Sequence, residues 1–146
     1  MLLVCSPGGH FMQMLALEPA WRARRHVWVT YSAADVDHLL ADEDRVLVHG
    51  PTNRSIANLL RNLLMAWRTV RELDPDVILS TGAGVALPFF LVGRLTGRRL
   101  VYVESLTRLG SLSLTGRLVY PLADDFFVQW PSAATRERTR YEGAVL

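Results

Sequence analysis

Short apolar segments that alternate with helix-like segments constrain the fold of this 146-residue chain most strongly. Six apolar runs are typical of buried strands: residues 1–5, 27–31, 45–48, 77–79, 100–103 and 125–128. Helices are expected between them: residues 11–23, bent or ended near Pro19; 33–40, with Ser32 as N-cap; 55–73; 85–95; 113–122; and a short helix in the tail from Ser132. This alternation predicts an α/β fold, a Rossmann-like doubly wound parallel sheet of about six strands, in a single domain of residues 1–146.

Two of the predicted strands end in glycine turns that precede a helix. Gly8 and Gly9 follow the first strand and lead to His10, and Thr81 and Gly82 follow the fourth. Glycine lets a backbone approach a ligand closely, and the free N–H groups of a helix start can bind an anion. A capped turn and close helix–sheet packing are the structural alternatives for these two segments. If the first and fourth strands are neighbours, both turns face one crevice at the carboxyl edge of the sheet.

His10 and two charged residues add chemistry to this edge. A histidine near neutrality acts either as a base or as a phosphate donor, and the sequence leaves both roles open for His10. Glu104 and Arg108 follow the fifth predicted strand, where a charge can reach the crevice. The structural alternative is an ion pair between them. Asp124 and Asp125 are expected to be structural.

Several function classes lack their signatures. A nicotinamide-binding domain requires a G-x-G-x-x-G turn and an acid at the end of the second strand, and a serine hydrolase requires G-x-S-x-G. No His/Cys/Asp spacing indicates a metal site. The net charge of +2 is low for a nucleic-acid module, although all sixteen basic residues are arginine, which binds phosphate well. The single cysteine, Cys5, falls in a predicted buried strand.

The sequence predicts a cytosolic protein or one attached peripherally to the cytosolic face of a membrane. Residues 1–5 are too short for the apolar region of a secretory signal. The longest uncharged run, residues 77–93, is interrupted by two glycines and Pro88, and it reads as strand, loop and helix rather than a membrane span.

The longest predicted helix, residues 55–73, allows two interpretations. Its apolar residues fall on one face: Ile56, Leu59, Leu60, Leu63, Leu64, Trp67 and Val70. Arginines seven residues apart form a basic line on another face: Arg54, Arg61 and Arg68. Ordinary core packing is favoured. The alternative is that part of the apolar surface, with Met65 and Trp67, touches a bilayer while the arginines meet anionic head groups.

A set of motifs in fixed order resembles one protein family along essentially the whole chain. The motifs are Pro-Gly-Gly-His at residues 7–10, Ser-Thr-Gly-Ala-Gly at 80–84, Val-Glu-Ser at 103–105 with Arg108, Ser-Leu-Thr-Gly-Arg at 113–117, Ala-Asp at 123–124 and Val-Gln-Trp-Pro at 128–131. The family contains the acceptor-binding, membrane-associated subunit of the two-part UDP-N-acetylglucosamine transferase of lipid-linked oligosaccharide synthesis. Its bacterial relatives are PssD-type subunits of capsule and exopolysaccharide glycosyltransferases.

The resemblance implies a fold like the N-terminal half of a GT-B glycosyltransferase and an inverting transfer without metal or cofactor. UDP-N-acetylglucosamine or a similar UDP-sugar would be the donor, bound mainly by a separate half-domain subunit, and a polyprenyl-diphosphate-linked sugar would be the acceptor. His10 and Glu104 would lie near the acceptor as catalytic residues. Phosphate and acceptor would be bound by Gly8, Gly9, Thr81, Gly82, Ser105 and Arg108. The chain would be active only with its partner, on the inner face of the plasma membrane.

A non-catalytic scaffold is the alternative from another class. In that case the chain recruits its partner to the membrane, and residues of the crevice play no part in the transfer.

Overall fold

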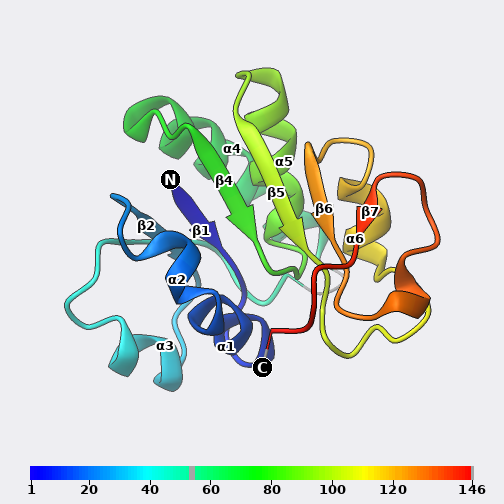
Figure 1. Cartoon of the computed structure of the whole chain (residues 1–146). Helices are drawn as coiled ribbons and strands as arrows, with labels where there is room; N and C mark the ends of the chain where they lie inside the picture. The colour runs from blue at the N-terminus through cyan, green and yellow to red at the C-terminus, as the bar shows by residue number, and fades with distance from the viewer. Residues whose placement is uncertain (53–54, 146) are drawn as a thin grey trace.

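A parallel seven-stranded sheet forms the centre of the computed structural model, which describes residues 1–52 and 55–145. The strands follow the order β3-β2-β1-β4-β5-β6-β7, and every pair is parallel (Figure 1). Their bounds are Leu2–Val4 (β1), Val27–Thr30 (β2), Arg45–Leu47 (β3), Val77–Ser80 (β4), Arg99–Val103 (β5), Asp125–Phe127 (β6) and Thr139–Arg140 (β7). The predicted α/β class is confirmed, and the first and fourth strands are neighbours as the crevice hypothesis requires.

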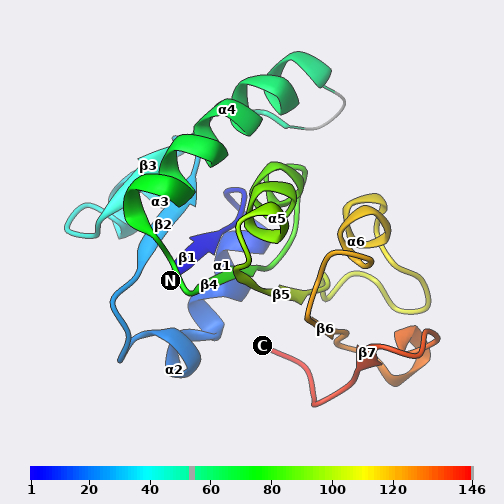
Figure 2. The same cartoon turned by 90° about the horizontal axis from the view of Figure 1, so that it is seen from above.

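Helices cover both faces of the sheet. Their bounds are Gly9–Ala16 (α1), Glu18–Trp21 (α2), Ala34–Leu39 (α3), Ile56–Leu73 (α4), Ala86–Leu95 (α5) and Leu114–Val119 (α6), with a 3-10 turn at Pro131–Ala133. Seen from above, the layer of α4, α5 and α6 lies on one side of the sheet, with α1 and α2 on the other (Figure 2). The doubly wound arrangement is therefore confirmed.

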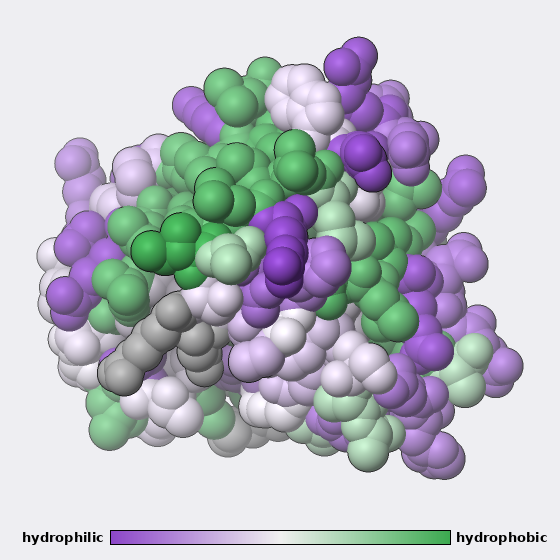
Figure 3. Space-filling model, turned by 180° about the vertical axis from the view of Figure 1, so that it is seen from behind, coloured by the Kyte–Doolittle hydropathy of each residue, from purple (hydrophilic) through white to green (hydrophobic). Residues whose placement is uncertain are grey.

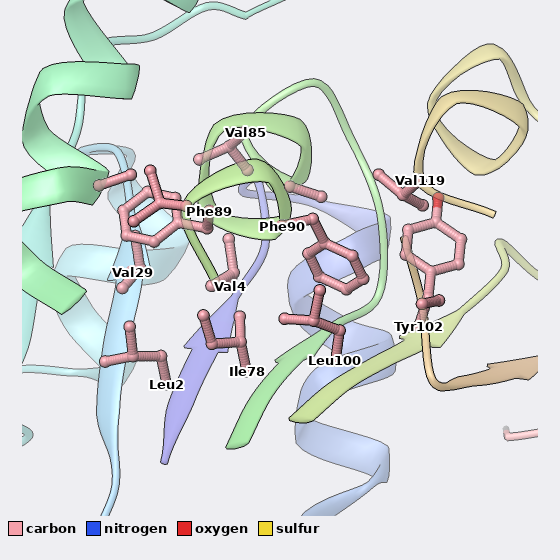
Figure 4. Close-up of a cluster of buried hydrophobic side chains, with 14 of the residues drawn as sticks. Leu2, Val4, Val29, Ile78, Val85, Phe89, Phe90, Leu100, Tyr102 and Val119 are labelled. Carbon is pink, nitrogen blue, oxygen red and sulfur yellow. The ribbon is translucent and has the colours of Figure 1, made fainter. Parts of the chain in front are cut away.

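Alternation of side chains along the strands divides the core into two halves. Leu2 and Val4 of β1 point toward the α4–α6 layer, where Phe89 and Phe90 of α5 are fully buried (Figure 4). Leu3 of β1 joins the opposite cluster, with Phe11, Met14, Trp21 and Trp28 among its members. Because both faces of the central strands are covered, these strands are apolar without interruption, which is the pattern that made them recognisable in the sequence.

Two local features differ from the sequence-based expectations. The tail forms a seventh strand, β7, whose two residues are too few to give a periodic signal. Ser32 does not cap α3: the N-cap is Ala33, without a side-chain bond, and the Ser32 hydroxyl donates to Asp37 instead. The expectations for Asp124 and Asp125 are confirmed, since they pair with Arg94 and Arg99.

Most of the large apolar residues of helix α4 are not buried in the core. Its buried residues are Asn62, Ala66, Thr69 and Val70, whereas Leu63 and Met65 are half-buried. Four of the predicted core residues are exposed to water, with exposed fractions of 75% for Ile56, 58% for Leu60, 69% for Leu64 and 43% for Trp67. The core-packing interpretation is wrong for these four. Arg61 and Arg68 are exposed, and Arg54 lies outside the described residues.

Small and polar residues at the buried positions of α4 bring its backbone close to the loop after β3. The carboxamide of Asn62, which is fully buried, accepts the N–H of His49 at 2.8 Å and donates to the carbonyl of His49 at 2.9 Å. One side chain therefore replaces a strand partner for both backbone groups of His49 and fixes the loop that leads into α4.

We expect Asn62→Ala to lower the free energy of unfolding by about 2 kcal/mol, because it leaves two backbone groups of His49 without partners in a half-buried place. Urea unfolding followed by circular dichroism measures the change. Asn58→Ala is the matched control: this residue of the same helix donates to the Pro51 carbonyl at an exposed site, and its loss should cost less than about 1 kcal/mol. Equal unfolding midpoints for the two variants would contradict the prediction.

Candidate functional site

An open cleft of about 950 Å³ lies at the carboxyl edge of the sheet. It is bordered by the segments that follow β1, β4 and β5 and by the first turns of α4, α5 and α6. Its polar lining includes Ser6, His10, Ser105, Thr107, Arg108 and Ser113. This is the place where the strand order of a doubly wound sheet reverses, between β1 and β4, and where such folds bind their ligands.

A reciprocal pair of hydrogen bonds joins the turns after β1 and β4. The Nδ1 of His10 lies 2.8 Å from the carbonyl oxygen of Thr81, and the hydroxyl of Thr81 donates to the carbonyl of His10 at 2.6 Å. Because a carbonyl only accepts, Nδ1 of His10 carries the proton. In the neutral ring Nε2 therefore keeps its lone pair and is able to accept a proton from a ligand in the cleft.

Gly82 leaves the space that the His10 ring occupies. Its φ of +120° is a conformation that side-chain-bearing residues rarely adopt, and a Cβ at this position would stand 2.8 Å from Cε1 and 2.9 Å from Nδ1 of His10. The hydroxyl of Tyr102 would be 3.3 Å from the same Cβ. Gly82 therefore acts through packing under the histidine, a role that neither sequence-based interpretation of this turn included.

Burial lowers the pKa of His10 below its ordinary value. The hydrogen bond with Thr81 and the charge of Glu104 oppose the shift, while the positive charge of Arg108 adds to it. Since a lowered pKa keeps the imidazole neutral at physiological pH, His10 has the protonation state of a base.

Two of the backbone donors that the sequence predicted for an anion already have partners. The N–H of Gly8 donates to the exposed carboxylate of Asp35 at 3.0 Å, and the N–H of Gly82 donates to the hydroxyl of Ser80 at 3.1 Å. Gly8 has a φ of +78° and is the N-cap of α1, a backbone conformation that glycine adopts readily and other residues rarely do. The N–H groups of Gly8 and Gly82 are therefore not free to bind an anion in this arrangement.

Glu104 is a buried carboxylate with an exposed fraction of 1%. One oxygen accepts the N–H of Ser105 at 2.9 Å, and the other accepts the N–H and the hydroxyl of Ser113 at 2.9 and 3.1 Å. A Cβ on Gly116 would stand only 2.1 Å from Oε2 of Glu104, so the start of α6 lies directly against this carboxylate. Glu104 thus bonds to serines of two cleft segments rather than forming the alternative ion pair with Arg108.

The loop that carries Arg108 is fixed from the end of β6. Gln129 donates to the carbonyl of Glu104 at 2.9 Å, and the indole N–H of Trp130 donates to the carbonyl of Leu106 at 2.6 Å. The Ser132 hydroxyl donates to the carbonyl of Leu109. These contacts hold the backbone on both sides of Arg108, whose side chain lines the cleft.

The predicted site residues divide into those that line the cleft and those that support it. His10, Ser105 and Arg108 line it, whereas Thr81, Gly82 and Glu104 lie buried beneath. Gly8 and Gly9 are exposed beside the lining. Sequence reasoning did not single out Ser6, Thr107 or Ser113, although Ser113 belongs to one of the family motifs and is the N-cap of α6.

One half of the cleft is apolar, and no pattern in the sequence predicted it. Its residues come from three helices: Ile56 and Leu59 of α4, Leu87 of α5, and Leu114 and Leu118 of α6. The three helices are neighbours, since α5 contacts both α4 and α6. These five residues form the apolar half of the cleft, and the polar Ser55 and Thr115 of the same segments line it beside them.

No three acidic, histidine or cysteine side chains within residues 1–52 and 55–145 lie close enough together to hold a metal ion. A transfer without metal stays a prediction.

Comparisons with known proteins give the chain a family. The family model described as oligosaccharide biosynthesis protein Alg14 like matches residues 45–145. The UDP-N-acetylglucosamine transferase subunit ALG14 of Eremothecium gossypii is 48% identical over 107 residues, which cover 66% of this chain and 48% of that protein. The Schizosaccharomyces pombe subunit alg14 is 46% identical over 77 residues, covering 49% of this chain and 37% of the relative. The chain thus spans less than half the length of these two relatives.

Solved structures resemble the fold. MurG of Acinetobacter baumannii has a TM-score of 0.76 at 17% identity, over 96% of this chain and 45% of that chain. The UDP complex of MnaA of S. aureus has a TM-score of 0.75 at 13% identity, over 99% of this chain and 44% of that chain. The chain therefore has the fold of a GT-B N-terminal domain, as predicted.

We expect NMR titration of the His10 ring to give a pKa below about 6.5, and Gly82→Ala to raise it toward that value. The added methyl displaces the ring from its buried position, which removes the desolvation that lowers the pKa. The same shift makes wild-type stability fall as the pH drops below about 6.5, because the unfolded chain then takes up a proton that the folded chain does not.

Gly97→Ala is the matched control for this prediction. Gly97 has a φ of +72°, so alanine is strained there too, but its Cβ would have nothing within 4 Å. We expect a loss of stability and an unchanged pKa of His10. An unchanged titration of His10 in Gly82→Ala would contradict the packing role of Gly82.

Proposed function

This chain belongs to the Alg14-like family of oligosaccharide biosynthesis proteins, and on that premise we propose that it is the acceptor-binding subunit of a two-part glycosyltransferase. Its donor is UDP-N-acetylglucosamine or a similar UDP-sugar, and its acceptor is a sugar linked to a polyprenyl diphosphate. The names of its relatives as UDP-N-acetylglucosamine transferase subunits support the donor class.

A separate partner supplies the other half of the active site in this proposal. The chain has the fold of one half of a GT-B glycosyltransferase, and it covers 45% and 44% of the two solved chains whose fold it shares. Such enzymes close a cleft between their domains, so the carboxyl edge described above faces a second body that holds the UDP-sugar. Alone, the chain is inactive.

The observation that carries the proposal is that His10 and Arg108 line the same cleft. Thr81 holds His10 with Nε2 unprotonated. Nε2 removes the proton from the acceptor hydroxyl while the oxygen of that hydroxyl attacks the anomeric carbon of the donor. Arg108 binds the diphosphate of the lipid-linked acceptor with help from the hydroxyls of Ser105 and Thr107. A single displacement inverts the configuration at the anomeric carbon. Hydrogen-bond donors rather than a metal ion stabilise the negative charge that develops on the UDP leaving group.

Glu104 acts through the residues that it binds. Its carboxylate holds Ser105 and Ser113 at the cleft and places negative charge near His10, which favours the imidazolium formed when the base takes up a proton. Gly8 and Gly9 lie next to the lining and would meet a bound diphosphate only if Asp35 released the N–H of Gly8.

The outer surface of the helical layer suits contact with a lipid bilayer. Ile56, Leu60, Leu64 and Trp67 are exposed along α4, and Arg61, Arg68 and Arg71 are exposed on the same helix. Figure 3 looks onto this side and shows broad hydrophobic areas with hydrophilic residues between and around them. No helix of the described residues is long and apolar enough to cross a membrane. We place the protein at a membrane through this face of α4, on the cytosolic side.

The relatives named above come from fungi, so the narrower prediction of a PssD-type subunit in capsule or exopolysaccharide synthesis at the plasma membrane stays a prediction.

We expect His10→Ala to lower kcat of the reconstituted two-subunit enzyme by about 10²–10⁴-fold, because the general base is lost. Arg108→Ala should raise the KM for the acceptor by about tenfold or more, because a charge-assisted bond to phosphate is lost. Transfer of radiolabelled N-acetylglucosamine to a prenyl-diphosphate sugar measures both.

Arg24→Ala is the control, since Arg24 is exposed at the opposite edge of the sheet. Unchanged circular dichroism shows that the variants fold. The scaffold alternative predicts full activity for both cleft variants, so that result would refute the catalytic proposal and leave only recruitment of the partner.

We expect Leu64→Glu to weaken binding to vesicles that contain anionic lipid by about tenfold, because an apolar contact with the bilayer becomes a charge. Cosedimentation with vesicles measures binding. Leu39→Glu, at a leucine 51% exposed on α3, should bind like the wild type. Equal binding by all three proteins would exclude α4 as the membrane surface.

A further inference from the structure

The apolar half of the cleft consists of large side chains that water reaches. Leu114 is 73% exposed, Leu118 47% and Ile56 75%, while Leu87 is half-buried and packs on the core below. A polar cleft for a sugar and a diphosphate does not require such a wall. Leucines gathered from three helices around one opening indicate a ligand with an apolar part.

The charge distribution of the cleft indicates what that ligand carries at its other end. Arg108 and the hydroxyls of Ser105, Thr107 and Ser113 line the same opening as the leucines. Ser113 and Leu114 are neighbours in the chain, at the N-cap and first residue of α6, so polar and apolar lining meet there. A ligand that satisfies both halves has an anionic head joined directly to a hydrocarbon chain.

We propose that the wall formed by Ile56, Leu59, Leu87, Leu114 and Leu118 binds the first isoprene units of the acceptor, next to its diphosphate. This inference rests on the proposed function. It adds that the protein itself binds part of the hydrocarbon of the acceptor, which would otherwise lie entirely in the bilayer. The hydrocarbon runs over Leu87 between α4 and α6. Beyond Ile56, which is also the first of the exposed apolar residues along α4, the hydrocarbon continues toward the membrane.

Binding of water-soluble probes to the chain without its partner tests the inference directly. Isothermal titration compares geranyl diphosphate, inorganic pyrophosphate and geraniol, each in metal-free buffer without detergent or lipid. We expect geranyl diphosphate to bind at least about tenfold more tightly than either of the others, because only it fills both halves. Equal affinities of geranyl diphosphate and pyrophosphate would overturn the inference.

Substitutions separate the wall from the phosphate site. Leu114→Ser and Leu118→Ser, both at exposed positions that should fold, are expected to reduce the affinity for geranyl diphosphate by about fivefold or more and to leave that for pyrophosphate unchanged. Leu95→Ser is the matched control, because Leu95 is 78% exposed on α5 and does not line the cleft. An equal effect of all three variants, or no effect of the first two, would overturn the inference.

Transfer by the two-subunit enzyme distinguishes failure of the inference from failure of the proposed function. Two acceptors carry the same diphosphate and sugar, one with a geranyl and the other with a methyl group. We expect a KM at least about tenfold lower for the geranyl acceptor. Equal KM values would refute the apolar subsite and keep the transferase, whereas transfer to neither acceptor would refute both.

Discussion

The contact between His10 and Thr81 is the interaction on which the site depends. It joins the two central strands beyond the point where their own ladder ends, because each residue uses one side-chain and one backbone group to bond the other. The same contact determines which nitrogen of the imidazole carries the proton. The parallel neighbours β1 and β4 make the contact possible, and Gly82 makes it sterically allowed.

Local pattern predicted the architecture because each central strand is covered on both faces and helices alternate with strands along most of the chain. Six of the seven strands, all but the two-residue β7, follow from the apolar runs. Prediction was weaker where the partner of a residue lies far away in sequence. The amide of Gly8 has the conformation expected of an anion-binding turn, yet it bonds to Asp35 twenty-seven residues later.

Helix α4 shows why periodicity alone misassigned a surface. Its large apolar residues recur on one side, as for a core helix, but its buried residues are Asn62, Ala66, Thr69 and Val70. Hydropathy does not distinguish an apolar face that meets the core from one that meets a membrane or a ligand. The apolar half of the cleft was not predicted for the same reason, since its leucines belong to three helices that only the fold brings together.

The contact of Gly116 with Glu104 has a consequence for how this sequence can change. Any side chain at position 116 would collide with an oxygen that already accepts two bonds from Ser113. Loss of the carboxylate alone would leave a void and three donors without this partner: the N–H and the hydroxyl of Ser113 and the N–H of Ser105. The two positions are therefore coupled: a side chain at position 116 fits only if the residue at position 104 is shorter or moves, and either change alters the start of α6, which lines the cleft.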